Sequence, residues 1–214
     1  MIIDHDEPSY RHRWQLSGKN KWNGAFYYSK EIVKNIIPRV KTDRNWVTVN
    51  QPGKAFDHSI FFVHNNLRPE RYDWLVAYKD LILVCGIPET MGKVAHLGTP
   101  VYLPLSVDVG YVERFKRESH PKDTAIVGRP AKIRKHRIKA DVLSGLPRRN
   151  LLEEMGKYKR VYAVGRTAIE ARILGCEILP YDERFPDPSI WRVLDNKDAA
   201  KLLQIELDRI DLHR

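Results

Sequence analysis

Cysteine is scarce in this sequence, and long apolar runs are missing. Only two of the 214 residues are cysteines, Cys85 and Cys176, and each lies in or beside an apolar run. We expect buried free thiols, since nothing indicates the oxidising compartment that a disulfide needs. No apolar run approaches the roughly 20 residues of a membrane-spanning helix. The charged start MIIDHDEPSYRHRW lacks a signal peptide's apolar region, so we expect a cytoplasmic protein.

Motifs for metal or nucleic-acid binding are also missing. The eight histidines are scattered and form no His/Cys cluster at the spacing of metal ligands. We therefore expect no metal and no resident cofactor. No recognised nucleic-acid motif is present. Aromatic and basic residues nevertheless interleave in YRHRWQLSGKNKWNGAFYY (10–28), which fits either a nucleic-acid surface or a loop that Trp14 and Trp22 fold onto the core.

Positive charge is abundant. The chain has 37 Lys and Arg against 27 Asp and Glu, a formal net charge of +10. This excess favours anionic partners, namely nucleotide phosphates, nucleic acid or an acidic membrane surface. The segment RPAKIRKHRIK (129–139) holds six basic residues and no acid. It is either a solvated face or an anion site.

Apolar patterns predict strands that alternate with helices. We expect strands at 45–50, 59–65, 80–86, 100–105, 123–128, 159–165 and 176–181, and helices at 27–40, 68–78, 89–98, 148–158, 167–175 and 197–211. This alternation is typical of parallel sheets built from βαβ units. The predicted fold class is therefore α/β.

An internal echo suggests two similar halves. Residues 78–108 can be laid over 158–182, because both run Tyr-Lys, strand, glycine, short helix, Leu-Gly and strand. We expect two Rossmann-like halves facing a cleft, divided at the polar segment KRESHPKD (116–123) into 1–120 and 121–214. One difference stands out: Thr167-x-x-Glu170 in the second half replaces Thr90-x-x-Lys93 in the first.

Loops in the second half converge on one edge of the predicted sheet. Ligands of parallel sheets bind outside the carboxyl ends of the strands. A helix that starts at Thr167 would point free N–H groups there, and Arg166 would add a cation. Glu170 would then be placed to accept hydrogen bonds from ribose hydroxyls. The same Thr-x-x-Glu pattern is also a plain capping box, which needs no ligand.

Two stretches carry a family resemblance. AIVGRPAKIRK (125–135) resembles the segment that opens the donor domain of two-domain, GT-B type glycosyltransferases, and residues 144–182 resemble the part that follows. The resemblance implies that cations after the first strand grip the donor diphosphate, that the glutamate binds ribose, and that LPLSVDVGYV (103–112) belongs to an acceptor-side domain. The implied binding residues are Gly128, Arg129, Arg134, Lys135, Gly165, Arg166, Thr167 and Glu170.

The resemblance implies a glycosyltransferase that needs no metal. Its co-substrate would be a nucleotide-diphosphate sugar, and it would transfer the sugar to an unidentified acceptor. Candidate bases for the acceptor hydroxyl are His64, which ends a strand, and Asp108, which follows one, and either also fits an ordinary loop residue. Gly53 and Lys54, after another strand, are expected to approach the substrate or to form an ordinary Pro-Gly turn. Two alternatives stay open: a nucleotide- or sugar-binding protein without chemistry, and a basic nucleic-acid-binding protein, including a DNA-modifying glycosyltransferase.

Overall fold

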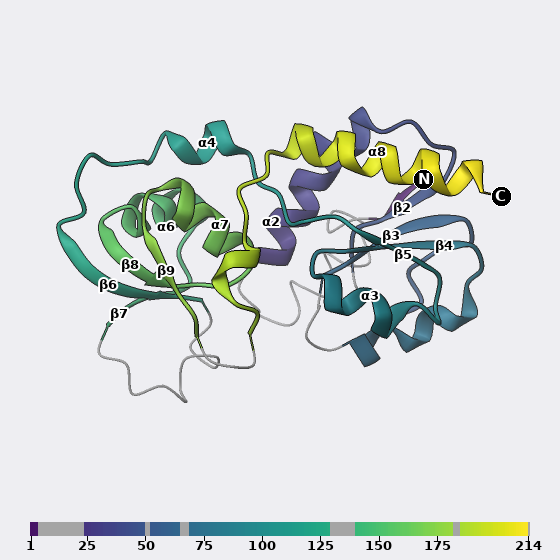
Figure 1. The fold of residues 1–214 in the computed structure, drawn as a ribbon, viewed down its shortest axis with the longest axis horizontal. Coiled ribbons are helices and arrows are strands. Elements are labelled where there is room, and N and C mark those ends of the chain that lie inside the picture. Colours follow the sequence, from purple (N-terminus) through teal and green to yellow (C-terminus); the bar gives the residue numbers. More distant parts are fainter. Residues whose placement is uncertain (4–23, 50–51, 65–68, 129–139, 182–184, 214) are drawn as a thin grey trace. The chain divides into compact units, whose positions relative to one another are not determined.

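The structure is a computed structural model that describes residues 1–3, 24–49, 52–64, 69–128, 140–181 and 185–213 (Figure 1). These residues pack as two compact units. The N-terminal unit comprises Met1–Pro104 together with Asn196–Arg214, and the C-terminal unit comprises Leu105–Asp195. The expected division into 1–120 and 121–214 stays a prediction about functional halves, and packing groups the residues differently.

The N-terminal unit is built on a five-stranded parallel sheet. Its strands are β1 (Ile2–Ile3), β2 (Asn45–Val47), β3 (Ser59–Val63), β4 (Leu81–Cys85) and β5 (Thr99–Tyr102), and they lie side by side in chain order. Every residue of β3 and β4 is buried. Continuous apolar runs such as SIFFV and LILVC behave this way when helices cover both faces of a parallel sheet.

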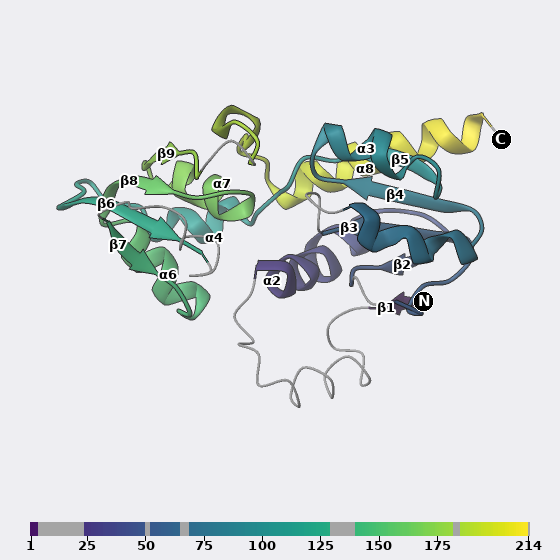
Figure 2. The ribbon, with the colours of Figure 1, turned by 90° about the horizontal axis from the view of Figure 1, so that it is seen from below.

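Helices cover both faces of this sheet (Figures 1 and 2). On one face, η3 (Pro69–Ala77) and α3 (Pro88–Val94) pack Tyr72, Leu75 and Val94 against Phe61 and Leu83. On the other lie α2 (Gly24–Glu31), η1 (Ile32–Ile36), η2 (Ile37–Arg39) and the C-terminal helix α8 (Asn196–Leu212), which packs on η1 and η2. Two hydrogen bonds join Gln204 of α8 to the backbone of Lys41.

One predicted helix is divided. The pattern over 27–40 predicts a single helix, but the chain forms an α-helix, a π-helix and a 3-10 turn in succession. Pro38 lies within the 3-10 turn. Proline lacks an N–H, so Pro38 cannot donate the backbone hydrogen bond that would continue a regular helix through this turn.

The C-terminal unit holds a four-stranded parallel sheet in the order β7 (Asp141–Leu143), β6 (Lys122–Val127), β8 (Tyr158–Tyr162) and β9 (Glu177–Leu179). Its helices are α4 (Val109–Glu113), α6 (Arg148–Met155), α7 (Arg166–Ile173) and the short η4 (Pro188–Ile190). Helix α7 packs against α4, α6 and β8. A separate apolar cluster joins Ile126 and Tyr181 with Tyr162 and Phe185.

The fold class is confirmed: the chain is α/β, with two all-parallel, Rossmann-like sheets. The echo also holds in topology, since β4–α3–β5 and β8–α7–β9 each join two neighbouring parallel strands. Both cysteines are buried free thiols, as expected. Strands β1 and β7 and helix α4 were not predicted. Among the described helices, none combines the length and apolar character that crossing a membrane requires.

Candidate functional site

The strand order of the C-terminal unit marks one point on its sheet. Strand β6 pairs with β7 on one side and with β8 on the other. All these strands are parallel, but the order in which the chain adds them to the sheet reverses at β6. In open parallel sheets, ligands bind outside the carboxyl ends of the strands where the order reverses. The candidate site is therefore the edge formed by the ends of β6 and β8, which we call the switch edge.

Gly128 follows β6 at this edge. Its φ of +145° is one that side-chain-bearing residues rarely adopt. A Cβ there would lie 2.7 Å from the hydroxyl oxygen of Tyr181, which follows β9. That hydroxyl donates a hydrogen bond to the carbonyl oxygen of Val127, the last residue of β6. Burial raises the pKa of Tyr181, so the phenol stays protonated and ties β6 to the segment after β9.

Gly165 follows the end of β8 and is the N-cap residue of helix α7, with φ +63° and ψ −139°. Since glycine has no side chain, the N-cap residue itself makes no capping hydrogen bond. The capping-box interpretation of Thr167-x-x-Glu170 is therefore wrong: the helix begins at Arg166, and Glu170 lies in its second turn. A helix N-terminus presents its first N–H groups to an anion.

Glu170 is a buried carboxylate bound by two arginines. The residue is only 5% exposed. Its Oε1 lies 2.8 Å from Nη2 of Arg148, the first residue of α6, and 3.5 Å from Nη2 of Arg166, the first residue of α7. The guanidinium of Arg148 also lies over the ring of Tyr111, 5.6 Å from its centroid. Arg148 thus makes the short contact, and Arg166 makes a long one.

This arrangement has a definite chemical capacity. Two cations and one carboxylate lie together in a largely buried place beside the N-terminus of α7. Such a place favours an anion over a neutral ligand. A sugar hydroxyl could reach Glu170 only through the little surface that its carboxylate still exposes or after Arg166 moves.

The two expected bases belong to different units. His64 follows β3, and its Nε2 donates a hydrogen bond to the carbonyl oxygen of Thr48, while its ring meets Tyr28 edge-on at 5.6 Å. Since a carbonyl only accepts, the base role would fall to Nδ1. Asp108 is the N-cap of α4 and accepts a hydrogen bond of 2.9 Å from the backbone N–H of Tyr111. That contact gives Asp108 a structural role, and its catalytic role stays a prediction.

The remaining predicted residues divide by position. Gly53 has φ +76° in an exposed turn after Pro52, with no atom within 4 Å of the position that a Cβ would take, and Lys54 is half-buried. Their approach to a substrate stays a prediction. Thr167 is half-buried in the first turn of α7. Arg129, Arg134 and Lys135 lie outside the described residues.

Sequence reasoning missed Arg148 and Tyr181. Arg148 follows Pro147 at the start of a predicted helix, but nothing local indicates that this helix end meets Glu170, 22 positions later. Tyr181 lies in the Pro-Tyr-Asp that ends the second apolar run, and its contact with Gly128 depends on how the strands are ordered. Both contacts are tertiary, so the pattern of neighbouring residues could not reveal them.

The described residues contain no group of three or more His, Cys, Asp and Glu side chains placed to hold a metal ion. Comparison with known proteins found no matching family model, no matching curated protein and no matching solved structure.

Proposed function

We propose that the C-terminal unit binds the nucleoside diphosphate of a sugar donor at the switch edge, and that the chain is a small glycosyltransferase. The observation that carries the proposal is the reversal of strand order at β6, which puts Gly128 and Gly165 at the position where open parallel sheets bind ligands. The start of α7, which has a glycine as its N-cap and carries Arg166 and Glu170 on its first two turns, supports it.

The residues divide the work of binding. The N–H groups at the start of α7 and the guanidinium of Arg166 would hold phosphate oxygens, because both present positive charge at this edge. Glu170 would accept from ribose hydroxyls, and Arg148 would keep its carboxylate in place through the 2.8 Å contact. The basic segment 129–139 follows Gly128 directly in the sequence and would add cations.

The proposed reaction needs little more than stabilisation of the leaving group. The acceptor hydroxyl gives its proton to a base and attacks the anomeric carbon, while the bond from that carbon to the diphosphate breaks. The diphosphate leaves with the electron pair, and the cations and helix N–H groups stabilise the charge that it gains. The base for the acceptor stays a prediction, for which His64 and Asp108 are the candidates in the sequence.

Calorimetric titration tests the binding step. Wild-type protein would be titrated with UDP, GDP and their sugar conjugates, beside Arg166→Gln and Glu170→Gln. Loss of a charged hydrogen bond predicts a roughly ten- to hundredfold weaker Kd for each variant. Lys159→Gln is the matched control, because Lys159 is an exposed cation near the amino end of β8. The site is wrong if no nucleotide binds, or if neither variant weakens the binding that occurs.

A second function, binding without transfer, also has an observation in its favour. Asp108, one of the two expected bases, already caps α4. A binding protein would show the same titration and the same sensitivity to Glu170→Gln. A binding protein would show no hydrolysis of the donor and no transfer of the sugar. His64→Ala would leave the affinity for the donor unchanged in a binding protein and in an enzyme alike.

A further inference from the structure

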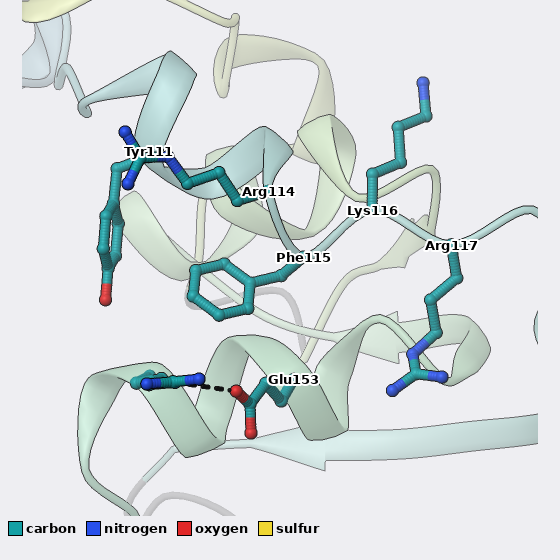
Figure 3. Close-up of a pocket in the computed structure, with 7 residues that line it drawn as sticks. Tyr111, Arg114, Phe115, Lys116, Arg117 and Glu153 are labelled. Atoms are coloured by element: carbon teal, nitrogen blue, oxygen red, sulfur yellow. Dashed lines mark hydrogen bonds and ion pairs between the residues drawn. The ribbon is translucent and has the colours of Figure 1, made fainter.

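An open hollow of about 670 Å³ lies in the C-terminal unit, apart from Gly128 and Gly165 of the switch edge. It is formed by α4, by the segment that follows it and by α6 (Figure 3). The lining residues are Tyr111, Arg114, Phe115, Lys116, Arg117, Arg149 and Glu153. Its volume falls in the range of about 300–1,000 Å³ that is typical of sites for small ligands.

Positive charge dominates this lining. Four of the seven residues are cations and one, Glu153, is an acid. The carboxylate of Glu153 is already engaged, since Nε of Arg149 donates to it over 2.9 Å. Arg114, Lys116 and Arg117 are exposed, and none of them forms an ion pair with a residue that the structure describes. These three charges are therefore available to an external anion.

Two aromatic rings lie among the cations. Tyr111 and Phe115 are half-buried and meet edge-to-face, with centroids 5.3 Å apart. In Figure 3 the Phe115 ring lies between the segment that follows α4 and helix α6, with Tyr111 to its left, Arg114 above it and Arg117 to its right. The Arg148 guanidinium covers part of Tyr111. Phe115 is thus the ring best placed to meet a planar ligand.

We infer that this hollow binds single-stranded nucleic acid. Sites for single strands combine cations that follow the phosphates with aromatic rings on which bases stack, and they need no sequence motif. Phosphates would contact Arg114, Lys116 and Arg117, and a base would stack on Phe115. An acidic peptide would use the cations but not the rings. The lining of this site does not include Arg166 or Glu170, and its one link to the proposed sugar-donor site is Tyr111, whose ring meets Arg148.

Fluorescence anisotropy with a labelled oligothymidine of roughly 12 nucleotides tests the inference on the full chain. The charge variant is Arg114→Gln/Arg117→Gln, and the ring variants are Phe115→Leu and Tyr111→Leu, which keep apolar volume. Lys93→Gln/Arg192→Gln is the matched control, since it removes two exposed cations that do not line the hollow. Circular dichroism of each variant confirms that it folds.

Two different signatures are expected. The charge variant should bind more weakly, and the slope of log K against log[salt] should become shallower by about 1.4, at about 0.7 per lost phosphate contact. Phe115→Leu should weaken binding roughly five- to a hundredfold at an unchanged slope, because stacking releases no counterions. The control variant should show nearly the same slope of log K against log[salt] as wild type. Glu170→Gln should bind the oligonucleotide as tightly as wild type.

Several results would overturn the inference. One is an absence of oligonucleotide binding at about 50 mM salt. Another is binding that persists at wild-type strength in the charge and ring variants, which would place it elsewhere on this basic chain. Equal affinity for heparin with no effect of Phe115→Leu would leave only a general polyanion surface. Binding to anionic lipid vesicles but not to the oligonucleotide would assign the hollow to a membrane surface.

Discussion

The two sheets of this chain differ in the order of their strands. In the N-terminal unit β1 to β5 lie in chain order, so no described pair of neighbours marks a reversal. In the C-terminal unit the chain goes from β6 to β7 on one side and then crosses to β8 on the other. Only this second arrangement creates a switch edge. Two units with the same alternation of strands and helices therefore differ in whether their strand order creates a ligand site.

The same contrast appears between two matching helices. Lys93 of α3 and Glu170 of α7 occupy the same place in the repeated Thr-x-x pattern. Lys93 is exposed, whereas Glu170 is buried against Arg148 and Arg166. A polar residue in that place is a solvated surface residue in one unit and the centre of a buried ion cluster in the other. Substitutions in both units can test that difference, beginning with the largest expected effect.

Removal of the buried carboxylate should cost the most. Glu170→Ala leaves the Arg148 and Arg166 charges buried without their shared partner, and breaking such a cluster costs about 3–5 kcal/mol. The matched change Lys93→Ala should stay within about 0.5 kcal/mol of wild type, because it lies on the surface. Urea unfolding followed by circular dichroism gives both free energies.

The two thiols report which unit has unfolded. Cys85 lies in the N-terminal unit and Cys176 in the C-terminal unit, and burial raises the pKa of the first to about 12 and of the second to about 11. Alkylation in urea, with mass spectrometry of each peptide, should show Glu170→Ala lowering the midpoint for Cys176 more than that for Cys85. Equal shifts for both thiols would contradict separate stability of the two units.

Glycines at the ends of strands should show a smaller difference. Gly128→Ala forces an L side chain to φ +145°, at about 1–3 kcal/mol, and it displaces the Tyr181 hydroxyl from its buried hydrogen bond. Gly53→Ala in the N-terminal unit meets no atom, so it should cost only the roughly 1–2 kcal/mol of a left-handed backbone. Tyr181→Phe in the Gly128→Ala background separates the two terms, since it removes the hydroxyl that clashes. If both glycine variants lose the same stability, the contact with Tyr181 carries no cost.

Local sequence patterns predicted more of the fold than of the candidate site. The runs LILVC and SIFFV are apolar throughout, so their burial in a parallel sheet followed directly from the residues. Strand β7 escaped prediction because DVL is only three residues long and two of them are exposed. The capping box failed because Gly165 makes the turn that a threonine cap would otherwise make. Arg148 escaped because its contact with Glu170 depends on how α6 packs on α7.

The smallest expected effect lies at the amino ends of β3 and β4, in the N-terminal unit. Nδ1 of His58 lies 2.5 Å from a carboxylate oxygen of Asp80, and its Nε2 lies 3.1 Å from one of Asp43. Hydrogen bonds to Asp80 and then to Asp43 raise the pKa of His58, while Arg44, which pairs with Asp80, opposes the shift. Since the folded state binds the proton more tightly, the stabilisation is complete below the unfolded pKa of about 6.5 and disappears as pH rises through the raised value.

The side chain of His58 is 41% exposed, so solvent screens its contacts with Asp80 and Asp43. We expect the free energy of unfolding to fall by only about 0.5–1 kcal/mol as the pH rises from below to above the pKa of His58. Urea unfolding of wild type across that pH range measures the loss. His58→Asn is the control, because asparagine tolerates the φ of +55° at this position but has no proton to bind, and its stability should vary less with pH. The pH dependence of the urea midpoint for Cys85 alkylation should differ between wild type and His58→Asn, whereas that of the midpoint for Cys176 should not. A pH dependence that is the same in His58→Asn would instead belong to groups shared by both units, and the N-terminal unit would lose its distinguishing titration.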